Sequence, residues 1–207
     1  DRLHIVVRGG GGHAAHPEQT VDAVLVAAQI VVALQTIVAR NIDPEQAAVI
    51  TIGSIHAGEA SNVIAETAEL RGSIRSFDPE VRATLHRRIH EVATGVAAAL
   101  GATAEVNTPY GVDATVNAPA PTALVQTVAA EVLGSTNVNT TYRSTGGEDF
   151  SAVLSEVPGQ FFFLGSRNRE LGTHFPHHNP RFDVDESCFP YGVAILCETA
   201  VRALAGE

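Results

Sequence analysis

The first residues that could do chemistry are a run of four glycines at positions 9–12 and the histidine that follows it, His13. A glycine-rich turn between a strand and a helix can cradle a phosphate, but this run lacks the lysine-containing P-loop spacing and the acid of a dinucleotide site. Phosphate binding is therefore the least favoured interpretation. The run is also compatible with a flexible connection, or with a loop that presents His13 where backbone segments approach closely.

Three of the nine histidines, His174, His177 and His178, lie within five residues of one another, in a loop that contains two prolines. Neutral imidazole is the commonest side-chain metal ligand, whereas a zinc site needs three or four protein ligands. No other cluster of cysteine, histidine or carboxylate residues has ligand spacing. The spacing favours metal binding and a solvated polar loop equally. A complete metal site would need ligands from elsewhere.

A glycine pair, Gly146 and Gly147, precedes the carboxylates Glu148 and Asp149 at a predicted helix start. Acidic residues in that position cap a helix more often than they catalyse, because they face its positive dipole end. We therefore expect capping ahead of catalysis at this pair.

Asn62 and Arg75 are the remaining candidates for substrate binding. Together they could hold a carboxylate, because the guanidinium fork matches its two oxygens. Taken singly, the asparagine is equally typical of a turn and the arginine of a surface charge.

The chain has 207 residues, with 13 basic and 23 acidic side chains and a formal charge of −10. The acidic balance argues against a nucleic-acid partner, since such binding needs a basic face that replaces counterions. The chain has 11 aromatic residues, 8 Phe and 3 Tyr, and no Trp or Met, so the core must be aliphatic. A chain that begins at Asp1 and lacks Met is expected to have lost, or never to have shown, a preceding segment.

The two cysteines and one apolar segment bear on location. Cys188 and Cys197 lie nine residues apart on a predicted helix, on opposite faces, which favours buried, unpaired thiols and a cytoplasmic protein. Residues 23–39 carry no charge but fall short of the roughly 20 residues that a membrane span needs. They predict a helix buried against a sheet or at a subunit contact, and no membrane partner.

The elements that position the candidates are strongly patterned over residues 1–111. Residues 3–8 predict a strand, a helix follows from Thr20 as N-cap to Arg40, and residues 47–55 and 63–77 are two β-rich runs. A second helix begins after Asp78 and ends at Gly101, and residues 102–108 predict a strand. This βαββαβ order predicts a ferredoxin-like fold, with two helices on one face of an antiparallel sheet. The polar side of the second helix is predicted to hold Arg82, His86, Arg87, His90 and Glu91.

Residues 112–207 have a different rhythm. Helices are predicted at residues 122–133, 149–156 and 186–205, with strands at 137–142 and 160–164. The strands look like interior ones, yet few partners exist for them. We expect this region to be part of a larger α/β domain whose other strands lie upstream of Asp1.

Several short motifs fall in a familiar order along nearly the whole chain. They are Gly11-Gly12-His13-Ala14-Ala15, Ser61-Asn62-Val63-Ile64, Leu70-Arg71-Gly72-Ser73-Ile74-Arg75-Ser76-Phe77, Gly147-Glu148-Asp149-Phe150-Ser151 and His178-Asn179-Pro180-Arg181-Phe182-Asp183. Each is weak alone. Jointly they resemble the dinuclear-metal aminoacylase and carboxypeptidase family, in the branch that contains hippurate hydrolase and auxin-conjugate amidohydrolases.

The resemblance implies an α/β metallopeptidase catalytic domain interrupted by a ferredoxin-like lid that also dimerises. Residues 1–111 correspond to the lid and residues 112–207 to the closing, C-terminal part of the catalytic domain. His178 corresponds to the last metal ligand. His13 corresponds to the lid histidine that reaches into the partner subunit's site and polarises the scissile carbonyl.

The same resemblance implies substrate roles for the other candidates. Asn62 and Arg75 correspond to residues that hold an N-acyl amino acid and its carboxylate, such as a hippurate-like compound or an N-acetyl amino acid. Gly146 and Gly147 correspond to the loop that lines the substrate site. The family reaction uses two divalent metal ions (Zn, Mn, Co or Ni), which bind a water that attacks the amide carbon.

The departures from the family limit what this chain can do. The family's Cys-x-His motif, its adjacent glutamates and its further histidine ligand are absent, so only the last metal ligand remains. We expect the parent protein to be an N-acyl-amino-acid amidohydrolase and homodimer, and the chain alone to be inactive and to hold no metal. The competing interpretation is a non-catalytic dimerisation or small-ligand-binding module.

Overall fold

The computed structural model describes residues 1–206 and divides into two compact units. Unit 1 comprises Asp1–Ala114 and Thr145–Glu148. Unit 2 comprises Thr115–Ser144 and Asp149–Glu207.

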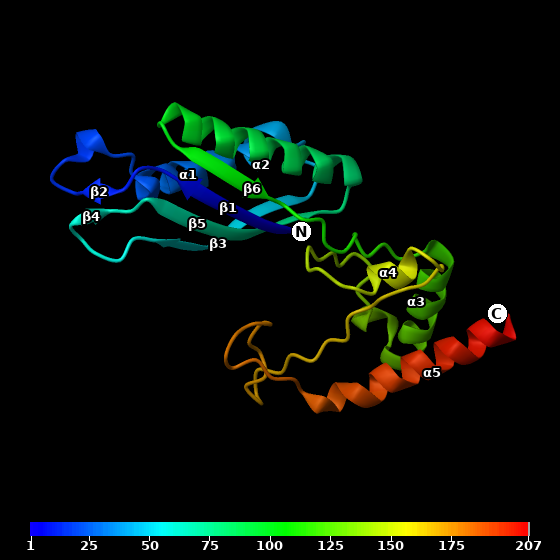
Figure 1. Cartoon of the computed structure of the whole chain (residues 1–207). Coiled ribbons are helices and arrows are strands. Elements are labelled where there is room, and N and C mark those ends of the chain that lie inside the picture. The colour runs from blue at the N-terminus through cyan, green and yellow to red at the C-terminus, as the bar shows by residue number, and fades with distance from the viewer. Residues whose placement is uncertain (207) are drawn as a thin grey trace. The chain divides into compact units, whose positions relative to one another are not determined.

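Unit 1 is built on a four-stranded sheet with the order β3-β5-β1-β6, in which every neighbouring pair is antiparallel. Both long helices, α1 and α2, lie on one face of this sheet (Figure 1). The order and the single covered face confirm the predicted ferredoxin-like fold. Its elements are β1 (Arg2–Arg8), α1 (Ala23–Asn41), β3 (Ala48–Ala57), β5 (Thr67–Ser76), α2 (Pro79–Ala99) and β6 (Thr103–Asn107).

The core of unit 1 is aliphatic, as the composition predicts. Alternate residues of the strands point toward the helices, because successive strand side chains face opposite ways. Helical residues spaced three and four apart meet them. The largest buried side chains in this core are Leu3, Ile5, Ile30, Leu34, Ile37, Leu70, Ile74, Leu85 and Ile89.

Helix α1 covers the sheet, although its predicted N-cap is wrong. The Asp22 carboxylate accepts hydrogen bonds from the backbone N–H groups of Val24 and Leu25, at 2.9 and 3.2 Å. Thr20 instead ends a 3-10 helix at Pro17–Gln19, and its hydroxyl donates to the Pro17 carbonyl. Aspartate and threonine are both favourable N-cap residues. Because Thr20 ends the preceding 3-10 helix, Asp22 caps α1.

Two segments, Ala23–Asn41 and Glu186–Ala205, are long and apolar enough to cross a membrane by length and composition alone. A helix that covers a sheet meets the same test. In α1 the inward side chains are buried in the core of unit 1, whereas Val24, Leu25 and Val32 are exposed.

Helix α2 begins and ends where the sequence predicts. Asp78 caps it by accepting from the N–H groups of Glu80 and Val81 at 2.8 and 3.0 Å. Gly101, at φ 78°, follows its last turn, a backbone conformation that glycine adopts without strain. On the predicted polar side of this helix, His86 is only 9% exposed, because its hydrogen-bond partners from distant segments cover it.

A second, two-stranded sheet extends from one end of unit 1, where β2 (Gly12–His13) pairs with β4 (Val63–Ile64) (Figure 1). The β-rich run predicted at residues 63–77 is therefore two strands, β4 and β5. Residues 9–21 and 58–66, which carry this small sheet, are called the arm below.

Unit 2 contains α3 (Pro119–Leu133), the short α4 (Ser151–Leu154) and α5 (Phe189–Ala205). Helices α3 and α5 pack through a small core of Val125, Val128, Ala129 and Ile195. The Arg202 guanidinium joins them, because it bonds Glu131 on α3 at 2.5 Å and Glu198 on α5 at 2.8 Å.

The two strands predicted in unit 2 are absent from the part of the chain that the structure describes. Residues 135–137 form a 3-10 helix. Near residue 160 the chain is irregular, and the Asn117 side chain bonds both backbone groups of Phe161, at 2.8 and 2.9 Å. A strand needs a neighbouring backbone, and here a side-chain amide takes its place.

The prediction for the cysteines is half right. Both are free thiols, as expected. Cys188, however, precedes α5 in a 3-10 helix at Glu186–Cys188, and Cys197 is exposed instead of buried. The helix predicted from residue 186 is therefore α-helical only from Phe189 onward, and Pro190 lies in the first turn of α5.

Candidate functional site

The glycine run brings three backbone segments together at the base of the arm. Gly9 N–H donates to the Glu66 carbonyl at 2.8 Å, and Gly10 exchanges two hydrogen bonds of 2.9 Å with Val21. A Cβ on Gly9 would lie 2.2 Å from the Val21 carbonyl oxygen, so only glycine fits. Of the three interpretations of this run, the geometry favours the close approach of backbone that presents His13.

His13 lies at the exposed end of β2, and its tautomer is set by the backbone. Its Nδ1 accepts a hydrogen bond from the Ala15 N–H at 3.1 Å, and a nitrogen that accepts cannot carry the proton. The proton of the neutral ring is therefore on Nε2. Because Nδ1 is engaged within the turn, Nε2–H is the ring donor left for other partners.

Asn62 is next to His13 in space, as the two-stranded pairing requires. Val63 pairs with His13 in the register of β2 and β4, and the Asn62 carbonyl accepts from the Ala14 N–H at 3.1 Å. Both side chains are exposed. The arm thus places His13 and Asn62 on neighbouring backbone segments, although 48 residues lie between them in sequence.

Arg75 and the Gly146–Gly147 turn form a second group. The Arg75 Nη1 donates to the Thr145 carbonyl at 3.0 Å, within unit 1. A Cβ on Gly147 would lie 3.4 Å from the same Nη1, so the glycine lets the backbone lie against the guanidinium. The structure thus places Arg75 beside this turn, and their substrate roles stay predictions.

These two groups lie at opposite ends of the sheet. Strand β5 begins at Thr67, beside the arm, and reaches Arg75 eight residues later. At a rise of about 3.3 Å per residue, that strand separates them by roughly 25 Å. A small molecule cannot contact His13 and Arg75 of the same copy of unit 1.

His178 lies in unit 2, in the exposed loop that contains the histidine cluster. It is the one non-glycine residue with positive φ, 65°, within residues 1–206. This conformation costs about 1–3 kcal/mol and persists only where surrounding structure imposes it. Here a turn imposes it, since the Asn179 N–H donates to the Pro176 carbonyl at 3.2 Å.

The loop is held at both ends. Asn168 pairs with Thr173 in an isolated bridge, and its side chain donates to Asp185 at 2.7 Å. The hydrogen bonds from Asn168 and Ser187 lower the pKa of the Asp185 carboxyl. Within the loop, the Nδ1 atom of His174 is buried and has no hydrogen-bond partner.

The metal ligands implied by the resemblance do not fit the residues present. Within residues 1–206, no group of three or more His, Cys, Asp or Glu side chains could hold a metal ion. His178 would be a single ligand, whereas a stable site needs at least three. We therefore derive no catalytic step through a metal from this chain.

The expected capping role of Glu148 and Asp149 is wrong. Helix α4 begins only at Ser151, with Phe150 in the N-cap position and no side-chain hydrogen bond to the cap. Asp149 contributes its backbone carbonyl to the Ala152 N–H, at 3.0 Å.

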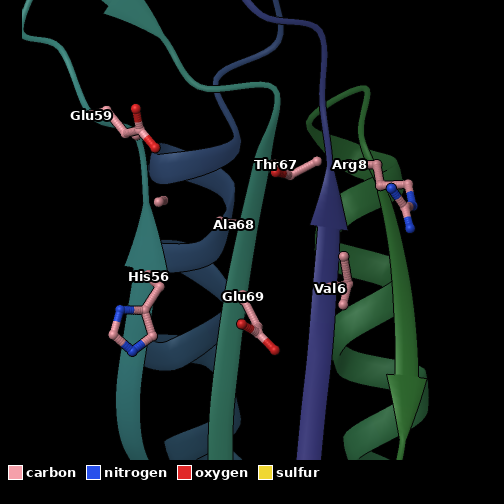
Figure 2. Close-up of a pocket in the computed structure, with 9 residues that line it drawn as sticks. Val6, Arg8, His56, Glu59, Thr67, Ala68 and Glu69 are labelled. Carbon is pink, nitrogen blue, oxygen red and sulfur yellow. The ribbon is translucent and has the colours of Figure 1, made fainter.

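Sequence reasoning missed an open depression of about 430 Å³ on the sheet face opposite the helices (Figure 2). It contains none of the predicted site residues. Glu69 within it is already engaged, bonding His4 at 2.6 Å and Arg71 at 2.7 Å, and these bonds lower the pKa of Glu69. The alternation of residues 68–75 signals such a polar face but not a hollow in it. The other lining residues are Val6, Arg8, His56, Ala57, Gly58, Glu59, Thr67 and Ala68.

Comparison with known proteins decides the family. Residues 1–100 match the peptidase dimerisation domain of the M20 family. The chain contains an M20 peptidase dimerisation domain. Relatives over nearly the whole chain are amidohydrolases, carboxypeptidases and deacetylases, which confirms the resemblance to the aminoacylase and carboxypeptidase family.

Thermostable carboxypeptidase 2 of Saccharolobus solfataricus is 38% identical over 203 residues, 98% of this chain and 51% of that protein. N-acetyl-L-cysteine deacetylase of Bacillus subtilis is 38% identical over 204 residues, 99% of this chain and 47% of that protein. The chain spans about half the length of the curated relatives it matches.

One solved structure joins the M20 fold to a metal. The YXEP protein of Bacillus subtilis, a dinuclear metal-binding peptidase of the M20 family, aligns with a TM-score of 0.70 and 29% identity. The alignment covers 99% of this chain and 50% of that one. The roles of His13, Asn62, Arg75, Gly146, Gly147 and His178 remain predictions.

Proposed function

We propose that this chain supplies the dimerising and substrate-positioning half of a metal-dependent amidohydrolase that cleaves N-acyl amino acids. The observation that carries the proposal is the position of its two polar groups at opposite ends of one sheet. His13 and Asn62 are exposed on the arm, roughly 25 Å from Arg75 by strand rise. Two copies related by a two-fold axis bring the arm of one to the Arg75 end of the other.

In this proposal each residue has a task that its geometry suits. Arg75 and the Gly146–Gly147 turn bind the substrate carboxylate. The Nε2–H of His13 donates to the amide oxygen as it becomes negative, and Asn62 orients the same group. In the intact enzyme His178 would be one ligand of two divalent ions (Zn, Mn, Co or Ni), whose other ligands are not among residues 1–206 and which would supply Lewis-acid chemistry.

The class of relatives supports this substrate. They include carboxypeptidases and deacetylases of acylated amino acids, which cleave an amide beside a carboxylate. Hippurate-like and N-acetyl amino acids present both groups. The cytoplasm is the proposed location, on the strength of two free cysteines.

The association state of the 207-residue chain tests the proposal directly. We expect a sedimentation mass of twice 21.7 kDa at micromolar concentration, and no hydrolysis of hippurate or N-acetyl amino acids with any of the four metals. A chain that stays monomeric at millimolar concentration would contradict the shared site. Hydrolysis by the chain alone would contradict its proposed inactivity. The whole amidohydrolase that we propose contains this chain is the further test. If it dimerised and bound a small ligand but hydrolysed no amide, the result would favour a non-catalytic module.

A further inference from the structure

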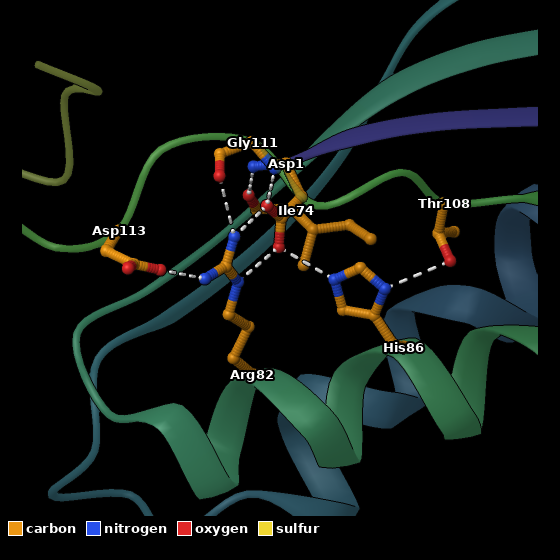
Figure 3. Close-up of polar contacts among 7 residues, drawn as sticks. All are labelled: Asp1, Ile74, Arg82, His86, Thr108, Gly111 and Asp113. Carbon is orange, nitrogen blue, oxygen red and sulfur yellow. Dashed lines mark hydrogen bonds and ion pairs between the residues drawn. The ribbon is translucent and has the colours of Figure 1, made fainter. Parts of the chain in front are cut away.

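A buried polar cluster lies where the chain enters and leaves unit 1 (Figure 3). Asp1 begins the unit, and residues 108–113 are the segment that leaves it after β6. Two residues of α2, Arg82 and His86, lie between these segments. They are four residues apart, so they occupy the same face of the helix.

The Asp1 carboxylate is the centre of the cluster, and its side chain is 2% exposed. It accepts from Arg82 Nε at 2.7 Å, from His86 Nε2 at 2.7 Å and from the Gly111 N–H at 2.6 Å. Arg82 Nη2 donates to Oδ1 of Asp1, the oxygen that also accepts from Gly111. A carboxylate this buried is stable only with such a full set of donors.

Arg82 and His86 also hold the departing segment. Arg82 Nη1 bonds Asp113 at 2.5 Å, and its guanidinium lies 4.5 Å from the centre of the Tyr110 ring. His86 stacks on the same ring at 4.4 Å, with 9° between the planes, and its Nδ1 bonds the Thr108 hydroxyl at 3.0 Å.

The cluster therefore attaches residues 108, 110, 111 and 113 to unit 1, although no strand or helix includes them. The chain returns to unit 1 at Thr145–Glu148, and the first part of unit 1 ends at Ala114. The last residue that the cluster holds is Asp113, one residue before that limit.

We propose that Asp1, Arg82 and His86 form a clasp, which keeps residues 108–113 fixed to unit 1 although these residues belong to no strand or helix. Without the clasp, the irregular segment after β6 would flex from Thr108 onward. This role is independent of the proposed function, because it needs no substrate or metal.

Hydrogen–deuterium exchange of the 207-residue chain tests the clasp. In the unaltered protein we expect peptides that cover residues 108–113 to be protected, because the Gly111 N–H bonds a buried carboxylate. Arg82→Met keeps the length of the side chain but removes its bonds. We expect it to raise exchange of residues 108–113 by about tenfold while β1, β5 and α2 stay protected.

The matched control is Arg87→Met, since Arg87 is on the same helix but bonds only Glu91 at the surface. Should Arg82→Met fail to fold, Thr108→Val gives a milder test, because it removes only the hydroxyl that His86 bonds. Rapid exchange of residues 108–113 in the unaltered protein, or an equal rise throughout unit 1 in both variants, would overturn the proposal.

Discussion

At the scale of single residues, the fold opposes the ionisation of His86. Burial, then the positive charge of Arg82, lowers the pKa of His86 from its ordinary 6.5. Asp1 and Asp113 carry the negative charges of the same cluster. The neutral ring satisfies both neighbours, because Nε2–H donates to Asp1 while Nδ1 accepts from the Thr108 hydroxyl.

The pH dependence of stability follows from the direction of this shift. The contribution of His86 is complete above about pH 6.5 and declines as the pH falls, because the unfolded chain then binds a proton that the folded chain resists. Urea unfolding between about pH 5 and pH 8 should show this decline, and His86→Gln should reduce it. His90→Gln, an exposed position on α2, should not; an equal effect of both variants would show that His86 is not responsible.

The same residue shows what sequence alone could not supply. Its spacing on α2 places it among Arg82, Arg87 and His90, which suggests a solvated helix side. Its partners, Asp1 and Thr108, are 85 and 22 residues away, and no local pattern announces them. Likewise, Asn62 could be named as a candidate, but its position beside His13 depends on a two-residue strand pairing.

Among the elements, the glycine run at the base of the arm can be tested by one methyl group. Gly9→Ala would place a Cβ 2.2 Å from the Val21 carbonyl oxygen, and backbone must move to relieve the clash. We expect a loss of about 1–3 kcal/mol in the free energy of unfolding. Chemical denaturation measures it.

A matched control is available in α2, where nothing lies within 4 Å of a Cβ added to Gly95. Gly95→Ala should stabilise the chain by roughly 0.5–1 kcal/mol, because alanine loses less backbone entropy in a helix. If Gly9→Ala were as well tolerated as Gly95→Ala, the run would be a flexible connection after all.

The two units differ in how far their elements could be predicted. In unit 1, the helices α1 and α2 and the strands that they cover carry periodic patterns, because each element buries a face within the same unit. In unit 2, residues 160–164 have the apolar pattern of an interior strand. The side-chain amide of Asn117, and not a neighbouring strand, bonds the backbone N–H and C=O of Phe161. Hydrophobic pattern predicts burial, whereas a strand also requires a neighbouring strand.

At the scale of the whole molecule, the separation of His13 from Arg75 makes a prediction about mixed dimers. In the amidohydrolase that we propose contains this chain, each site takes His13 from one subunit and Arg75 from the other. His13→Ala and Arg75→Ala should each abolish activity when present in both subunits. A heterodimer of the two variants has one site with both residues altered and one with neither.

Mixing the two inactive variants in equal amounts, with subunit exchange, should therefore restore about one quarter of the unaltered activity, since half of the dimers are mixed and each has one intact site of two. The measurement is the rate of hippurate or N-acetyl amino acid hydrolysis before and after exchange. Mixing His13→Ala with Asn62→Ala is the matched control. Both residues lie on the same arm, so each site takes both from one subunit, and every site of the mixed dimer lacks one of them. An intact site would form only if the two residues came from different subunits. Because β2 and β4 pair within one chain, we expect no recovery in that control, and recovery there, or none with Arg75→Ala, would contradict a site shared in this way.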